Sequence, residues 1–475
     1  IEAGHDYPNI DELPDEIRQG HATGADMTID PEGEHNWGFT AKATPLHTDM
    51  PVPRGKITGG TSAINGQVYL RAIPEDFDYW VEEGNDEWSF EKVLPFLKNL
   101  ENDLDLTNRY HGNDGPIIVR RYPLDELVDD QAAFIKAATT AGFSRTDDHN
   151  HPASSGVGPL PLNNPDGVRW STAIGYLTMA RDRQNFTISP DSHTTRILFN
   201  DKRAVGVEYL KGGVSRQVSA KEIVLSAGPI GSPHLLMLSG IGPAAQLEAA
   251  GITVVNDMPG VGQNLRDHPS VHVRWSADDN FSMPDVKIGP QKVALRYTAR
   301  GSPFRNDMIA VMRWNSPKRE FMMSAGLYLA KASGELKLDP NNPYQQPLLD
   351  YHLLDHPYDL SRMRDAVYMH IEFGRHPAYK GILKKLIDPV KEDLRSDESL
   401  NNWMLRRAST MHHISCTAKM GSSEDNMSVV NQFGRVHGIE ALTIADISIM
   451  PDCPRANTNS PAIMIGERIA SFMMA

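Results

Sequence analysis

Three stretches of the chain predict a strand, a tight turn and a helix, and they lie at its beginning, its middle and its end. Residues 1–4 (IEAG) are typical of the end of a strand, and residues 221–228 (KEIVLSAG) form an apolar run that predicts a strand buried on both faces. The helix after this run should have Ser232 as its N-cap and Pro233 in its first turn. Residues 442–451 and 459–473 again predict strand, loop and helix. We therefore expect one domain assembled from separated segments, with a second domain between them.

The intervening residues predict short strands and a few amphipathic helices. Apolar residues at helical spacing predict helices within 88–102, with Ser89 as N-cap, over 124–141 and over 359–373. Alternation with a period of two predicts antiparallel strands at 186–190, 193–199, 203–210 and 215–220, with a hairpin turn at 200–202. The predicted fold class is α/β, or mixed α+β, with interleaved segments.

Composition excludes several classes of function. The 475 residues suffice for two or more domains. A net charge of −14 without a cluster of Lys and Arg argues against a nucleic-acid partner. No apolar stretch reaches the roughly 20 residues of a membrane span. The two cysteines, Cys416 and Cys453, are too few for a disulfide framework, so we expect a reducing, cytoplasmic location.

Three further motifs carry residues suited to binding or chemistry. Residues 57–66 (ITGGTSAING) contain consecutive glycines that let a backbone approach a ligand, although a Gly-Gly pair is more often only a turn. Residues 227–243 (AGPIGSPHLLMLSGIGP) have the simpler interpretation of ordinary strand–helix packing. Residues 410–421 (TMHHISCTAKMG) and 457–468 (NTNSPAIMIGER) offer a histidine that can move a proton and an asparagine that cannot titrate. Most of the 18 histidines must be structural or exposed, so this pairing gains weight only beside the other motifs.

These motifs, in this order, resemble the glucose–methanol–choline (GMC) oxidoreductase family, whose members use FAD to oxidise alcohols. The resemblance rests on PRGKITGGTSAING with YLRAIPEDFDYW, on GPIGSPHLLMLSGIG, and on HHISCTAKMG with NTNSPAIMIGER. Supporting matches are HGNDGP (111–116), RWSTAIGYL (169–177), VGQNLRDHP (261–269) and VHGIEALTIADISIMP (436–451). The resemblance covers nearly the whole chain.

The resemblance implies a discontinuous, Rossmann-like FAD-binding domain and an interleaved substrate-binding domain built on an antiparallel sheet. Residues 1–75, 170–270 and 405–475 are expected in the FAD domain, with 76–169 and 271–404 on the substrate side. In this family an acidic residue after the second strand meets the cofactor ribose, and Glu2 fits that position. The strand, glycine-rich turn and helix that come before it in relatives are not in the printed sequence, so we expect that sequence to be truncated at its front.

The resemblance also implies which residues act. The family places the base immediately before x-x-[Gly/Cys]-Thr, which selects His413 over His412, and its partner is Asn457, where some relatives carry histidine. His413 would take the hydroxyl proton, Asn457 would help to hold the alkoxide, and hydride would pass to flavin N5. The expected cofactor contacts are Glu2, Gly60, Thr61, Asn65, Gly66, Gln67, Val68, Thr194, His412, Asp446, Ile447, Asn459 and Ser460.

Two details concern the cofactor itself. A helix that starts near Asn459 or Ser460, with Pro461 in its first turn, would stabilise negative charge on reduced flavin. Some relatives tether FAD through a histidine where this chain has Ile64, so FAD should be bound non-covalently here. We expect no metal site.

Substrate, acceptor and even reaction class stay open at this point. The SCT triplet at 415–417 resembles choline dehydrogenases but does not identify the alcohol, and the electron acceptor is either oxygen or a quinone- or dye-type compound. The alternatives are a lyase on the same scaffold, of the hydroxynitrile lyase or photodecarboxylase type, and a flavin-free structural relative. A yellow protein that an alcohol bleaches without oxygen would favour the dehydrogenase or oxidase.

Overall fold

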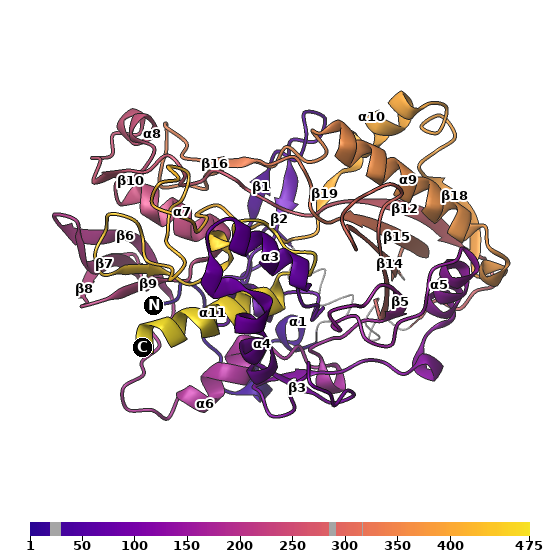
Figure 1. The fold of residues 1–475 in the computed structure, drawn as a ribbon, viewed down its shortest axis with the longest axis horizontal. Helices are drawn as coiled ribbons and strands as arrows, with labels where there is room; N and C mark the ends of the chain where they lie inside the picture. Colours follow the sequence, from indigo (N-terminus) through magenta and orange to yellow (C-terminus); the bar gives the residue numbers. More distant parts are fainter. Residues whose placement is uncertain (20–29, 285–290, 316) are drawn as a thin grey trace.

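An antiparallel sheet of seven strands lies at one end of the molecule, at the right in Figure 1. The computed structural model describes residues 1–19, 30–284, 291–315 and 317–475, and the seven strands are counted among these residues. The strand order is β18-β12-β15-β14-β13-β5, and β19 also pairs with β12. The strands are β5 (Gly156–Pro159), β12 (Pro269–Ala277), β13 (Val293–Tyr297), β14 (Met308–Asn315), β15 (Glu320–Leu327), β18 (Leu383–Asp388) and β19 (Ser409–Thr410).

The two faces of this sheet differ in polarity and in what covers them. Helices α5 (Asp129–Thr140) and α9 (Pro357–Gly374) pack on one face, and α10 (Asp397–Arg407) packs beside α9. Trp275 points to this side, since a Cβ on Gly374 of α9 would overlap its ring. The alternate residue His272 points to the opposite face, where its ring hydrogen-bonds to the Ser324 hydroxyl across the β12–β15 pair (2.8 Å). Along β12 the period-two pattern therefore separates an apolar, helix-covered side from a polar one.

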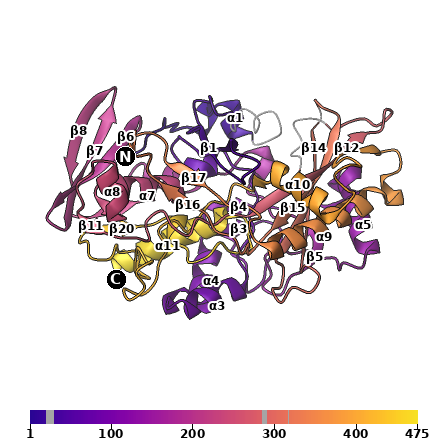
Figure 2. The same ribbon diagram turned by 90° about the horizontal axis from the view of Figure 1, so that it is seen from above.

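A second antiparallel sheet lies at the other end, as Figures 1 and 2 both show. It consists of β6 (Ser192–Asn200), β7 (Arg203–Lys211) and β8 (Val214–Ser219), which confirms the predicted hairpin at 200–202. Beside it, β9 (Ile223–Leu225) pairs in parallel with β20 (Leu442–Ile444). The prediction of a strand buried on both faces is wrong for β9, because the Val224 side chain is 42% exposed. In this two-stranded sheet the alternate side chains point to opposite faces, and only one face is packed.

Helix α7 (Gly228–Leu238) starts five residues earlier than predicted, with Ala227 rather than Ser232 as its N-cap. Pro233 is therefore inside the helix, where it cannot donate to the carbonyl of Pro229 four residues before it. The Thr417 hydroxyl donates to that carbonyl instead, at 2.6 Å. Ser232, which we expected to cap the helix, donates its hydroxyl to Asp446 (2.6 Å). Tertiary contacts thus make a proline inside this helix acceptable.

Other predicted helices and strands differ from the observed ones in their ends, their N-caps or, in one case, their presence. Helix α4 (Phe90–Asn99) has Ser89 as its N-cap, as predicted, whereas α5 begins only at Asp129. Helix α11 (Asn459–Met474) has Thr458 rather than Asn459 or Ser460 as its N-cap. Residues 186–190 form no strand, contrary to the prediction, and the Ser189 carbonyl among them accepts the Glu2 amide (3.0 Å). The remaining helices and strands are α1 (Asp15–Arg18), β1 (Phe39–Ala41), β2 (Met50–Val52), α3 (Pro74–Glu82), β3 (Glu101–Asp103), β4 (Ile117–Val119), α6 (Thr178–Ala180), β10 (Ile241–Gly242), α8 (Ala244–Ala249), β11 (Asn256–Asp257), β16 (Glu335–Lys337) and β17 (Leu348–Asp350).

Segments distant in sequence are interleaved in space. Strand β5 pairs with β13, so the stretch around residue 157 joins the large sheet. Helix α4 packs instead on α11, and Arg468 of α11 pairs with Glu87 (2.8 Å) in the short 3-10 turn that precedes α4. The predicted mixed α/β fold with an antiparallel sheet is confirmed, while the five predicted domain boundaries stay a prediction. Within the described residues, no helix combines the length and the apolar character that crossing a membrane requires.

Candidate active site

The backbone of the histidine loop is fixed by one buried carboxylate. Strand β19 ends at Thr410, and its hydroxyl donates to Asp267. The same carboxylate accepts the amide hydrogens of His413 (3.0 Å) and His268 (2.6 Å). Asp267 therefore binds the backbone of both histidines, and this contact ties the loop to the start of β12.

The ring of His413 lies between Asn457 and His268. Its Nε2 is 3.1 Å from the amide nitrogen Nδ2 of Asn457, and its Nδ1 is 2.8 Å from Nδ1 of His268. His413 is only 6% exposed. The structure thus brings together the two residues predicted to act on the substrate, although they are far apart in sequence.

Both rings of the His268–His413 pair are neutral at physiological pH. Burial lowers the pKa of His413 well below its ordinary value, and the nearby His268, His412 and Arg54 lower it further. Burial also lowers the pKa of His268, to about 3, although a backbone hydrogen bond with Pro454 opposes this. A neutral imidazole has one nitrogen with a free lone pair, and a proton acceptor requires that lone pair.

His412 and His413 are adjacent in sequence but differ in surroundings. The backbone of His412 is left-handed, with φ of +67°, and its side chain is exposed while that of His413 is buried. Arg54 donates to the His412 carbonyl (3.0 Å), so the peptide between the two histidines is held in place. Of the two, His413 alone has its ring against Asn457.

The glycine-rich turn is held by a buried arginine. Gly59 and Gly60 have φ of +95° and +55°, a region in which glycine is not strained, and they lead into a short 3-10 helix, Gly60–Ala63. Arg169, 1% exposed, donates to the carbonyls of Ala63 (2.8 Å) and Asn65 (2.9 Å), and also to those of Glu16 and Ile17. One side chain therefore connects the turn to the N-terminal segment.

The other residues predicted around this turn are used by the protein itself. The Thr61 hydroxyl accepts the Gly55 amide (3.2 Å), and Asn65 accepts the Gln67 amide (2.9 Å). Val68 forms a bridge with Leu162, and the Gln291 side chain lies 3.2 Å from where a Cβ on Gly66 would stand. These contacts shape the turn and leave the surface of Gly60 open.

Asp446 and Ile447 link three segments. Asp446 accepts the Gly228 amide at the start of α7 (3.0 Å), the Ser232 hydroxyl and the Ser448 amide. Burial raises the pKa of Asp446, and these hydrogen bonds oppose the rise. The Ile447 carbonyl accepts the Cys416 amide (3.1 Å), so the histidine loop is attached to the same junction.

Glu2 and Thr194 lie near one another at the edge of the β6–β8 sheet. The Glu2 backbone pairs with Ser189 and Ser192, two residues before Thr194 in β6. The Glu2 carboxylate turns back to the Gly4 amide (2.7 Å), and burial raises its pKa although that amide hydrogen bond opposes the rise. Both predicted residues are thus far along the chain from His413, Thr194 within β6 and Glu2 beside it.

Several buried polar atoms near the histidine loop fit the predicted FAD. Asn457 Oδ1, Asn459 Nδ2 and Ser460 Oγ are buried in the described structure without a hydrogen-bond partner. Two of them belong to the first turn of α11, whose free amides favour negative charge. Gly60 has no atom within 4 Å of where its Cβ would stand, so a flat ligand could approach its backbone. Unused donors, a helix N-terminus and an open glycine surface are what a flavin with a phosphate-bearing tail requires.

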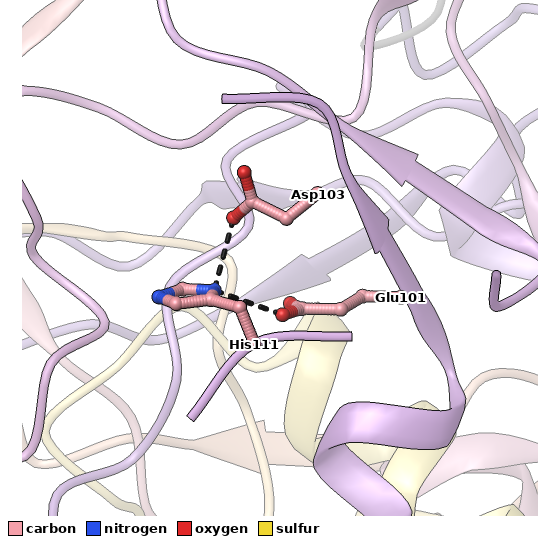
Figure 3. Close-up of side chains that lie close together, drawn as sticks. All are labelled: Glu101, Asp103 and His111. Atoms are coloured by element: carbon pink, nitrogen blue, oxygen red, sulfur yellow. Dashed lines mark hydrogen bonds and ion pairs between the residues drawn. The ribbon is translucent and has the colours of Figure 1, made fainter. Parts of the chain in front are cut away.

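A second cluster of titratable groups surrounds His111, 0% exposed at its side chain (Figure 3). Its Nδ1 is 2.9 Å from Glu101 and 3.0 Å from Asp103, and its Nε2 is 3.0 Å from Asp148. Burial alone would lower the pKa of His111, but the hydrogen bonds to Asp103, Asp148 and Glu101 raise it to about 10. His111 is therefore an imidazolium.

The residue types of this cluster would suit a metal, but its charges are already paired. Arg71 is 2.5 Å from Glu101, and Arg121 is 2.9 Å from Asp103 and 3.4 Å from Asp148. Two guanidinium groups and one imidazolium balance three carboxylates. We interpret the cluster as a structural ion network that joins β3, β4 and the loop at 148.

Sequence reasoning missed several residues of the site. His268 and Asp267 stood in the motif VGQNLRDHP, and Arg169 opened RWSTAIGYL, but both stretches served only as supporting matches. Cys453 was considered only as a disulfide partner, yet its Sγ is 3.2 Å from the His268 ring. The signal for His268 was its position beside an acidic residue and before a proline at a strand start.

Comparison with known proteins agrees with the geometry. A family model described as GMC oxidoreductase matches residues 38–270, and a second with the same description matches 330–466. An oxygen-dependent choline dehydrogenase of Photobacterium profundum is 34% identical over 454 residues, which are 89% of this chain and 80% of that protein. One of Ectopseudomonas mendocina is 34% identical over 478 residues, 92% of this chain and 83% of that protein.

Solved structures agree as well. Pyridoxine 4-oxidase from Mesorbium loti superposes with a TM-score of 0.90 at 26% identity, over 99% of this chain and 92% of that one. Formate oxidase of Aspergillus oryzae RIB40, at 22% identity, shares the fold with a TM-score of 0.88. The family models cover most of the chain and relatives above 30% identity span nearly all of it, so the chain belongs to the GMC oxidoreductase family.

Proposed function

We propose that this protein is an FAD-dependent enzyme that oxidises an alcohol to an aldehyde or ketone, with His413 as the base. The observation that carries the proposal is the contact of His413 Nε2 with Asn457 Nδ2, at 3.1 Å, inside a buried and neutral site. The names of relatives support it, since two relatives in sequence are named choline dehydrogenases and a structural neighbour is named pyridoxine 4-oxidase, and both choline and pyridoxine are alcohols.

The residues that would hold FAD come from three segments. The turn with Gly60, Thr61, Asn65 and Gly66 and the first turn of α11, with Asn459 and Ser460, would contact the flavin, while Glu2 would meet the ribose. The chemistry that bound FAD supplies is acceptance of the hydride that leaves the carbinol carbon. We propose that Thr194, Gln67, Val68, His412, Asp446 and Ile447 complete the cofactor site.

The chain itself moves the proton and holds the oxygen. A substrate hydroxyl between His413 and Asn457 would give its proton to Nε2 of the neutral imidazole. The Asn457 amide would donate a hydrogen bond to the same oxygen, and the bond strengthens as negative charge develops there. Asn457 cannot titrate, so it can stabilise the alkoxide at any pH at which the enzyme is folded.

We propose that FAD is held without a covalent bond, because Ile64 replaces the tethering histidine of some relatives. Ile64 is 6% exposed and packs with Ile57 and Ala63, and its alkyl side chain has no nitrogen to attach. Acid precipitation should therefore release all of the flavin to the supernatant as FAD. Flavin that stays with the denatured pellet would refute this.

An anaerobic screen of alcohols tests the function. Choline and pyridoxine head the list because they appear in the names of relatives, and bleaching of the flavin spectrum identifies a substrate. Recolouring by oxygen, or only by a quinone or dye, then distinguishes an oxidase from a dehydrogenase. A full-length protein without flavin, or one that no alcohol bleaches, would contradict the proposal.

We also propose a cytoplasmic location, because Cys416 and Cys453 are both free and buried. Cell fractionation tests this, and recovery of the protein with secreted material would refute it.

A further inference from the structure

We propose that His268 is a positioning residue: together with Cys453 it forms a hydrogen-bond chain that keeps the single proton of neutral His413 on Nδ1. The inference rests on the proposed function, in which the lone pair on Nε2 of His413 accepts the substrate proton. A ring with its proton on Nε2 would have no free lone pair facing Asn457 and could not act.

The hydrogen-bond chain consists of four consecutive contacts. Asn457 Nδ2 is 3.1 Å from Nε2 of His413, and the two Nδ1 atoms of His413 and His268 are 2.8 Å apart. On its other side, His268 Nε2 is 3.2 Å from the Cys453 sulfur, which lies 3.6 Å from the backbone carbonyl of His413. The last contact returns to the backbone of His413, the second residue of the series.

The contact with Asn457 fixes which nitrogen of each histidine ring carries the proton. An amide NH2 can only donate, so His413 Nε2 must present its lone pair to Asn457. A neutral His413 then carries its proton on Nδ1 and donates it to Nδ1 of His268. His268 in turn carries its own proton on Nε2 and donates it to the Cys453 sulfur.

The contact of Cys453 with the His413 carbonyl leads independently to the same proton positions. A backbone carbonyl can only accept, so the contact with the His413 carbonyl uses the one proton of the Cys453 thiol. The sulfur is then an acceptor toward His268 Nε2, which requires the proton on that nitrogen. Both ends therefore lead to one arrangement of protons.

The surroundings keep both rings neutral, which this arrangement needs. Asp267, the nearby carboxylate, accepts from the two backbone amides and from Thr410, not from either ring. The Tyr328 ring packs edge-on against His268, with 4.5 Å between centroids. Among the hydrogen bonds that the described residues make to the two rings, every side-chain partner is uncharged.

A matched pair of variants separates positioning from folding. Asparagine places a carbonyl oxygen near the former Nδ1 of His268 and can accept from His413, whereas leucine has nearly the same size and cannot accept. In His268→Leu we expect the limiting rate of flavin reduction by a working alcohol to fall about 10- to 100-fold, with little change in the concentration of alcohol that half-saturates it. His268→Asn should recover most of that loss.

NMR can show which ring nitrogen carries the proton without any enzyme turnover. Histidine-selective 15N NMR of the holoenzyme, assigned with His413→Gln and His268→Gln, should show His413 protonated on Nδ1 and His268 on Nε2. In His268→Leu the His413 ring should shift toward the Nε2-protonated form. If no alcohol is oxidised, the proposed function fails while the spectrum still decides this inference.

Two results would overturn the inference. One is a wild-type spectrum with the His413 proton on Nε2, which decides the question even if the leucine variant does not fold. The other is a folded His268→Leu enzyme as fast as the wild type, or an asparagine variant as slow as the leucine variant.

Discussion

His111 and His413 are both buried, and their opposite charge states come from their neighbours. His111 contacts three carboxylates, and hydrogen bonds to them raise its pKa to about 10 in spite of its burial. His413 contacts an amide and a second imidazole, and burial lowers its pKa well below the ordinary value. Burial without a carboxylate leaves a base with a free lone pair, and burial among carboxylates leaves a permanent cation.

This contrast separates a structural histidine from a reactive one. Both ring nitrogens of the His111 cation face carboxylates, Glu101 and Asp103 at Nδ1 (Figure 3) and Asp148 at Nε2, so its protons are held within the network. The lone pair of His413 faces Asn457, which is only half-buried, beside unused polar atoms of α11. Substitutions in the two regions should therefore affect different measurements.

The largest expected effect is on the chemical step. His413→Ala should lower the rate of flavin reduction by roughly 10²–10⁴, the range for losing a positioned general base. His412→Ala is the matched control, and its loss should be much smaller because its ring does not contact Asn457. Stopped-flow reduction by a substrate from the alcohol screen measures both variants. A crippled His412→Ala with an active His413→Ala would show that the assignment is off by one residue.

The next effect is on stability alone. His111→Gln removes a cation that contacts two buried carboxylates, Glu101 and Asp103, and the partly buried Asp148, and it should lower the free energy of unfolding by about 3–5 kcal/mol. Arg395→Gln breaks an exposed pair with Glu392 (3.1 Å) and should change nothing measurable. Chemical denaturation compares the two variants, and the folded fraction of His111→Gln should keep its rate of flavin reduction. Equal stabilities would mean that the network does not hold the fold.

A smaller effect on the rate is expected at Asn457. Asn457→Ala removes one hydrogen bond to a charged oxygen, worth about 1.5–3 kcal/mol, so flavin reduction should slow roughly 10- to 150-fold. Asn457→His, the residue that some relatives carry, should be less impaired because it still donates. The same stopped-flow assay tests the order. An alanine variant as fast as the wild type would remove Asn457 from the mechanism.

The smallest effect is a pH dependence that belongs to the ion network. Burial raises the pKa of Asp103, but His111 and Arg121 lower it to about 2, so its contribution is complete above roughly pH 4 and is lost as the pH falls through 2. The raised pKa of His111 makes its contribution complete below roughly pH 6.5 and lost as the pH rises through about 10. The stability difference between wild type and His111→Gln should thus be greatest near pH 5 and shrink toward pH 10. A difference that grows with pH would contradict the assignment of charge.

The periodicity of the sequence predicted the helices and strands that depend on local pattern. It did not predict the features that depend on contacts between distant segments. The hairpin at 200–202 and helix α9 follow from local patterns, and both are present. The start of α7 could not be predicted, because a proline inside a helix is acceptable only where another segment, here through Thr417, satisfies the carbonyl it leaves free. The exposed Val224 could not be predicted either, since an apolar strand residue does not show whether a neighbour covers it.

The candidate site was predicted by motif and extended by geometry. His413 and Asn457 stand in long motifs, and the fold places their side chains 3.1 Å apart. His268 and Cys453 join them only through the fold, from the start of β12 and from the loop before α11. No local pattern distinguishes a histidine whose ring orients another histidine from one that simply packs.

A histidine-selective 15N NMR titration of the holoenzyme between pH 5 and 9 tests the contrast most directly. We predict one ring that stays doubly protonated throughout and disappears in His111→Gln, and one that stays neutral throughout and disappears in His413→Gln. A His413 ring that becomes protonated near pH 6.5, as a free histidine does, or a His111 ring that loses its proton there, would contradict the prediction.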